Sequence, residues 1–205
     1  MSDGSVPTAG AGRVLGIDPG IGTTGWGVVE PDGAAGWRLV AAGAIRPAPE
    51  DAIGLRLRAV HEGVTRVLRE HAPAAVAVEE AFGGVNIRSA IRLGEARAVC
   101  LLAAAQADLP VHEVPPALVK KAVAGHGRAG KEAVRSAVLT LLRAQALPGS
   151  DRLPHDATDA LALALTASTR MEVRRRLGVP VGRRPRSGRR ARWTAGDVER
   201  LTGGA

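Results

Sequence analysis

Four carboxylates stand where an apolar run ends or a helix is expected to begin, and their spacing constrains how this chain can fold. Asp18 closes LGID, Glu79 closes AVAVE, and Asp156 and Asp159 open HDATDALALAL. Carboxylates that crowd together raise one another's pKa and destabilise a fold. Divalent cations such as Mg²⁺ remove that cost, because each takes oxygen ligands from one or two carboxylates together with water and substrate phosphate. A fold that gathers these acids therefore predicts a site for two cations and phosphodiester chemistry.

The order of the apolar runs predicts an α/β fold. Three strands are expected first, connected by tight turns as a meander, in RVLGID, GWGVVE and WRLVAAGAIR. Apolar residues then recur at helical spacing from Leu55 to Leu68, before the short buried strand AAVAVEE. The remaining expected elements are a strand in PVHEVP and helices at about 86–106, 117–124, 131–145 and 156–169. Together they predict a mixed five-stranded sheet with helices on both faces.

The chain has room for one folded domain. Its 205 residues are 45% hydrophobic, which is enough for a sizeable core, and we expect the domain to span residues 13–169. Residues 1–12 have neither a basic start nor an apolar stretch, so they are typical of a flexible leader rather than a signal peptide. The apolar runs are far shorter than the ~18 residues that cross a bilayer, and the single cysteine, Cys100, cannot form an internal disulfide. We expect a cytoplasmic protein without membrane association.

The net charge of +8 arises at the end of the chain. From residue 170 onward there are 11 arginines and three acids, so segment 170–205 carries the whole excess and the preceding residues are balanced. Its charge and its glycine and proline content predict a disordered basic tail. Such a tail would supply a diffuse attraction to polyanions.

Each of the four acids also has a purely structural interpretation, which spacing alone leaves open. Asp18 could bond the amides of the turn that follows it. Glu79 could form a buried salt bridge, because a lone buried carboxylate needs a partner. Asp156 and Asp159 could cap a helix, since acids three residues apart at a helix start suit its dipole.

Four sequence segments together resemble the successive motifs of the RuvC family of bacterial Holliday-junction resolvases: GIDPGIGTTGWG, AVEEAF, NIRSAIRLGEARA and HDATDALALA. The resemblance covers about residues 13–169. It implies an RNase H-like fold and a homodimer that makes paired nicks in four-way DNA junctions and works with the branch-migration complex RuvAB. It also implies two Mg²⁺ ions per subunit, with Mn²⁺ as a substitute, and product ends bearing a 5′-phosphate and a 3′-hydroxyl.

Carried over by motif, Asp18, Glu79, Asp156 and Asp159 are the catalytic, metal-binding acids that the resemblance implies. Glu79 is preferred to Glu80 because the family's phenylalanine follows three residues later. Trp26 replaces a common tyrosine, and Ala98 replaces a usual glycine. Some members carry histidine at the position of Asp156, which leaves the role of the neighbouring His155 open.

DNA contacts are expected from lysines and from one aromatic residue. All three lysines fall between positions 120 and 131, as Lys120, Lys121 and Lys131, beside the glycine-rich AGHGRAGK. Phe82, the only phenylalanine, follows the Glu79 strand and could stack on a base at the branch point. The alternatives are a solvated lysine surface and a phenylalanine that anchors the core.

Self-association is expected from the segment NIRSAIRLGEARAVCLLAAAQ. Its small and apolar residues at helical spacing allow close packing of two helices across a two-fold axis, with Ile91, Ala98 and Leu102 as interface residues. Burial against the chain's own sheet explains much of the same pattern, so both interpretations stay open.

Two other function classes remain possible at this level. GIDPGIGTTG also resembles the first phosphate loop of ATP-binding domains of the actin and sugar-kinase type, although those proteins need two domains and this chain has room for one. A non-catalytic nucleic-acid module that uses the basic tail is the second alternative, with the acids serving only as caps and ion pairs.

Overall fold

The computed structural model describes residues 12–33, 36–80, 86–143 and 153–177. A five-stranded sheet with the order β3-β2-β1-β4-β5 forms its centre. The strands are β1 (Val14–Asp18), β2 (Thr24–Pro31), β3 (Trp37–Ile45), β4 (Ala75–Glu79) and β5 (Val111–Val114). The first three are antiparallel neighbours, whereas β4 runs parallel to β1 and β5 parallel to β4. The predicted mixed five-stranded sheet is confirmed.

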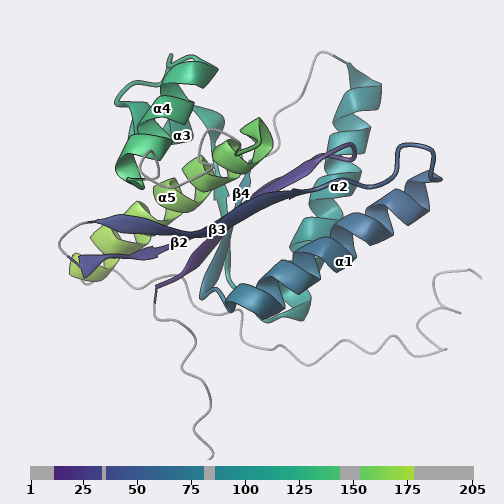
Figure 1. Ribbon diagram of the computed structural model, residues 1–205, viewed down its shortest axis with the longest axis horizontal. Helices are drawn as coiled ribbons and strands as arrows, with labels where there is room; N and C mark the ends of the chain where they lie inside the picture. Colours follow the sequence, from purple (N-terminus) through teal and green to yellow (C-terminus); the bar gives the residue numbers. More distant parts are fainter. Residues whose placement is uncertain (1–11, 34–35, 81–85, 144–152, 178–205) are drawn as a thin grey trace, which may run out of the picture.

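The helices cover both faces of this sheet, as Figure 1 shows. They are α1 (Ile53–His71), α2 (Ile87–Gln106), α3 (Pro116–Ala124), α4 (Lys131–Leu141) and α5 (His155–Arg176). Successive side chains of a strand point to opposite faces. In β1, Leu15 and Ile17 pack into the core beneath α1 and α2, whereas Val14 packs into the core with α3, α4 and α5. The apolar runs of β1 and β4 are therefore buried on both sides, as expected for parallel central strands.

Two helix ends differ from their predicted positions. Helix α4 was expected to reach Gln145 but ends at Leu141, and Arg143 has a left-handed φ of 51°, which breaks the helical path. Helix α5 was expected to end near Thr169 but continues to Arg176, so the predicted start of the basic tail at residue 170 falls inside this helix. In its last turns, Glu172 accepts hydrogen bonds from two arginines that follow it at helical spacing.

Within the described ranges, no helix is long and apolar enough to span a membrane. Cys100 is buried and unpaired, as its apolar surroundings predict, and burial raises the pKa of its thiol to about 12. This cysteine is a core residue rather than a reactive thiol.

Candidate active site

Asp18 and Glu79 end two neighbouring parallel strands at the same level of the sheet. The register pairs Ile17 with Val78, and one acid follows directly on each strand. Ala77 packs into the core with α5, and Glu79, two residues later, faces the same side of the sheet. Glu80, by contrast, is exposed, and as the next residue along the chain it falls on the opposite side of the alternation. The geometry therefore agrees with the choice of Glu79 over its neighbour.

Helix α5 brings Asp156 and Asp159 to these strand ends because it lies unusually close to β1 and β2. A Cβ atom at Gly16 would lie 1.9 Å from the carbonyl oxygen of Ala160. One at Gly25 would lie 2.0 Å from the carbonyl oxygen of Asp156. Only glycine leaves room for the helix backbone at these two positions. The sequence analysis placed Gly16 inside a strand and Gly25 at the start of the next one, and it predicted no helix packing at either.

Arg135 of α4 anchors the start of α5. Its Nη1 donates to the carbonyl oxygen of Leu153 at 3.0 Å and to Oγ1 of Thr158 at 2.8 Å. The helix begins at His155, and its N-cap residue, Pro154, makes no side-chain cap bond. Asp156 is therefore not the N-cap residue, but it lies in the first turn of the helix, where its negative charge suits the dipole. The anchor had no signal in the sequence, because it joins residues that are 18 and 23 positions apart and meet only through tertiary packing.

The other structural interpretations of the acids also lack support within the described residues. Thr24, not Asp18, closes the turn after β1, because its Oγ1 donates to the carbonyl oxygen of Gly20 at 2.8 Å. In that part of the chain, the carboxylate of Asp18 accepts no hydrogen bond and the carboxylate of Glu79 forms no ion pair. Among the described residues, no side-chain hydrogen bond or ion pair explains why these two acids stand at the strand ends.

Three of the four acids line one cleft of about 220 Å³. Asp18, Glu79 and Asp159 share it with Lys120 of α3 and Lys131, the first residue of α4. A lysine is unfavourable at a helix start, where the dipole is positive, so its place opposite the acids indicates a role for its charge. The rest of the lining is apolar and consists of Pro116, Val119, Val134, Ala162 and Leu163. Asp156 does not line the cleft; it precedes Asp159 by three residues on α5.

Burial and mutual repulsion raise the pKa values of the cleft acids. Burial, followed by the charges of Asp159, Glu79 and Asp156, raises the pKa of Asp18 to about 7. Burial is also the largest cause of the raised pKa values of Glu79 and Asp159, and the charge of Lys131 partly opposes it for all three acids. The cleft is thus electrostatically unfavourable as it stands and would be stabilised by added positive charge.

The donor set of the cleft fits a hard divalent cation in its chemistry. Within the described residues, no three His, Cys, Asp or Glu side chains already surround a common point as metal ligands. Mg²⁺ suits this arrangement, because it takes one or two carboxylates and keeps several waters or phosphate oxygens.

The other predicted DNA-contact residues are not all at the cleft. Lys120 and Lys131 line it, but Lys121 is exposed and is not among the lining residues. Phe82 lies outside the described residues. His155 is exposed at the start of α5, and its charge partly opposes the rise in the pKa of Asp159 that burial causes.

Helix α2 presents two apolar faces. Ala96, Cys100, Ala103 and Ala104 are buried on the sheet side. Away from the sheet, Ile91 is 56% exposed and Leu102 is 50% exposed, and Ala98, on the same face, is exposed too. Burial against the chain's own sheet therefore explains only one of the faces.

Arg97 of α2 links this helix to the cleft. Its Nε donates to the backbone carbonyl oxygen of Glu79 at 3.1 Å, and its guanidinium group also pairs with Glu113 of β5. Sequence reasoning did not single out this residue. The sequence offered one indication, an arginine among the small residues of the LGEARA segment. It did not indicate the partners of this arginine, because tertiary packing determines them.

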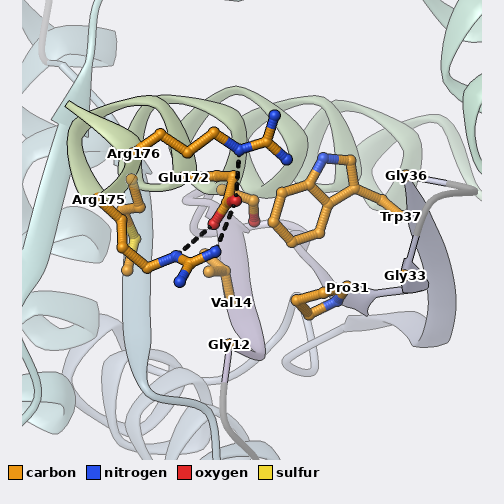
Figure 2. Close-up of a pocket in the computed structure, with 11 residues that line it drawn as sticks. Gly12, Val14, Pro31, Gly33, Gly36, Trp37, Glu172, Arg175 and Arg176 are labelled. Atoms are coloured by element: carbon orange, nitrogen blue, oxygen red, sulfur yellow. Dashed lines mark hydrogen bonds and ion pairs between the residues drawn. The ribbon is translucent and has the colours of Figure 1, made fainter.

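A larger cavity, of about 580 Å³, lies near the C-terminal end of α5 (Figure 2). Its lining is largely apolar and includes Val14, Trp37 and Met171. Among the described residues that line it, Glu172 is the only acid, and it is bonded to Arg175 and Arg176. This cavity lacks the converging carboxylates of the acidic cleft and is not the candidate active site.

Comparison with known proteins identifies similar sequences and structures. Residues 14–167 match the family model described as crossover junction endodeoxyribonuclease RuvC. A crossover junction endodeoxyribonuclease RuvC from Azorhizobium caulinodans is 47% identical over 161 residues, covering 78% of this chain and 90% of the relative. One from Chloroflexus aggregans is 42% identical over 172 residues, covering 82% and 99%. The solved structure of T. thermophilus RuvC in complex with a Holliday junction substrate matches with a TM-score of 0.71 and 38% identity, covering 82% of this chain and 96% of that one.

Proposed function

Because this chain belongs to the RuvC family of crossover junction endodeoxyribonucleases and has its RNase H-like fold, we propose that it resolves four-way DNA junctions by paired, symmetric nicks. The observation that carries the proposal is the convergence of Asp18, Glu79 and Asp159 on one cleft, with Asp156 beside them. The family match covers residues 14–167, from β1 into α5, which favours a junction nuclease over an ATP-binding domain of the sugar-kinase type.

The cleft provides what hydrolysis of a phosphodiester needs. We assign Asp18, Glu79, Asp156 and Asp159 to two Mg²⁺ ions, with Mn²⁺ as a substitute. When bound, such ions activate water and stabilise charge at the scissile phosphate. The carboxylates would orient the ions, while Lys131 would hold the phosphate close and partly offset the acidic charge. No covalent enzyme intermediate is required, and the products would carry a 5′-phosphate and a 3′-hydroxyl.

The apolar wall of the cleft has its own part in the proposed reaction. Val119, Val134 and Leu163 exclude bulk water from one side, which strengthens the electrostatic interactions between the carboxylates and whatever they bind. Lys120 and Lys121 would contact backbone phosphates next to the scissile one, and Phe82 would stack on a base at the branch point.

Paired nicks require two active sites, and the exposed apolar face of α2 supports a homodimer. Ile91, Ala98 and Leu102 lie on that face and would pack across a two-fold axis. The proposal includes action in recombination and repair, the complex RuvAB as a partner and a cytoplasmic location. The arginine-rich segment after α5 would add nonspecific attraction to DNA.

A cleavage assay on synthetic four-way junctions tests this function. With Mg²⁺, the protein should nick opposed strands of the junction and leave a linear duplex of the same sequence intact. Asp18→Asn should still bind junctions but lose cleavage. Asp108→Asn is the matched control, because Asp108 is exposed in the turn before β5, at the opposite end of the parallel strands. Cutting by Asp18→Asn at the wild-type rate would remove this acid from the site, and absence of any junction cleavage in Mg²⁺ or Mn²⁺ would favour a non-catalytic DNA-binding module.

A further inference from the structure

A separate cavity lies between β5, at the edge of the sheet, and the C-terminal half of α5. It measures about 180 Å³, and its lining includes His112 together with Arg170 and Arg174. The two arginines are four residues apart and therefore project from the same face of the helix. His112 lies two residues before Val114, which packs into the core on the α5 side, so its imidazole faces the helix. Three nitrogen-rich side chains thus meet at one cavity.

Among the described residues, these side chains have no anionic partner. Within the described residues, neither Arg170 nor Arg174 forms an ion pair or a side-chain hydrogen bond. Glu113 also lines the cavity, but its carboxylate is paired with Arg97 of α2, on the other face of the sheet. The acid nearest in sequence, Glu172, is bonded to Arg175 and Arg176, as Figure 2 shows.

The imidazole of His112 also lacks a hydrogen-bond partner among the described residues. Its Nε2 is buried and has no hydrogen-bond partner in the described part of the chain. A buried polar nitrogen without a partner is costly and calls for an explanation. Burial, and then the charges of Arg170 and Arg174, lower the pKa of this histidine. An anion in the cavity would relieve the arginine repulsion and could accept a bond from the imidazole.

We propose that His112, Arg170 and Arg174 form an oxyanion site that takes a phosphate group. Guanidinium groups match the geometry of phosphate oxygens and bind them with paired hydrogen bonds, so two arginines on one helix face provide the main contacts. The site is distinct from the acidic cleft, because Arg170 follows Asp159 by eleven residues, roughly 16 Å along α5. It does not depend on the proposed nuclease function. The phosphate group can be inorganic phosphate or a phosphodiester of bound DNA.

NMR of the histidine side chains in the full-length protein tests the site without DNA. Inorganic phosphate is titrated at constant ionic strength with chloride, and the His112 signal is assigned through correlations to the β5 backbone. We expect a saturable shift of this signal in the wild type and in the control variant R175A/R176A. The shift should be lost, or need at least tenfold more phosphate, in R170A/R174A. The control removes the same charge from the same helix end but spares the cavity, and circular dichroism checks that both variants are folded.

An equal response of the two double variants, or a non-saturating shift in the wild type, would overturn the site and leave only general attraction to a basic helix. A second arm identifies the source of the phosphate group. Junction binding is measured in an Asp18→Asn background, which does not depend on cleavage. If the site takes a DNA phosphodiester, R170A/R174A should weaken junction binding more than R175A/R176A does, and equal losses would assign the site to free phosphate.

Discussion

At the scale of single residues, Asp18 carries the largest electrostatic cost of the cleft. Its pKa is raised from an ordinary value of 3.8 to about 7, so the ionised form destabilises the folded state. The folded protein holds this proton more tightly than the unfolded chain, and stability is therefore lost as the pH rises from about 4 to 7. The penalty is complete above that window and absent below it. A shift of about three pKa units corresponds to at most about 4 kcal/mol.

Asp18→Asn should therefore stabilise the protein when no divalent cation is present. In urea unfolding with a chelator, we expect the gain to be largest at pH 8 and clearly smaller at pH 5. Mg²⁺ should stabilise the wild type more than the variant, because it removes the same repulsion. Asp108→Asn serves as the control. It should show neither the pH-dependent gain in stability nor the reduced stabilisation by Mg²⁺. A gain independent of pH would contradict the electrostatic explanation.

We predict that Arg97 is a positioning residue that acts through Glu79. Its hydrogen bond to the Glu79 carbonyl oxygen holds the end of β4, so Arg97→Ala should misplace the carboxylate without removing it. We expect kcat to fall by about ten- to a hundredfold, KM for the junction to stay near its wild-type value, and more Mg²⁺ to be needed for half-maximal rate. Arg92→Ala, which breaks only an exposed pair with Glu95 on the same helix, is the control. Loss of stability with unchanged kcat and Mg²⁺ requirement would show that Arg97 is only structural.

At the scale of elements, the close approach of α5 to β1 decides the geometry of the cleft. Gly16→Ala would place a methyl group against the backbone of Ala160, which cannot move without shifting the whole helix. We expect a loss of about 3 kcal/mol in unfolding free energy and a large loss of cleavage, because α5 carries two of the acids. Gly54→Ala on α1 has open space around it and should gain up to about 1 kcal/mol. Cleavage at the wild-type rate by Gly16→Ala would show that the helix position is not critical.

At the scale of the whole molecule, the proposed coordination of two cuts depends on the exposed apolar face of α2. Leu102→Glu would place a charge on each side of the proposed two-fold interface, and we expect dimer affinity to fall by at least about tenfold, or 1.4 kcal/mol. Val173→Glu is the control, because Val173 is 48% exposed on α5 and Leu102 is 50% exposed. Sedimentation measures the dissociation constant. Unchanged affinity of Leu102→Glu, or paired nicking by a protein that sediments as a monomer, would contradict this interface.

The sequence by itself determined the strands, most helix starts and the face on which the acids lie. Alternation of side chains along a strand is local, so a carboxylate at the end of LGID or AVAVE is assigned to a strand end without knowing the fold. The same holds for α5, in which Asp156 and Asp159 precede an apolar run. Local backbone geometry imposes these periods, and each can be read within about ten residues.

Only the tertiary structure decided which groups meet. It placed Asp156 beside rather than in the cleft wall, bound Arg97 to the strand that ends at Glu79, and extended α5 beyond its predicted end. It also brought His112 to the arginines of α5. These contacts join residues far apart in sequence, and they depend on how closely one element packs on another. The absence of a Cβ atom at Gly16 allows α5 to approach β1 closely. The local pattern of apolar residues does not show how close two elements will pack.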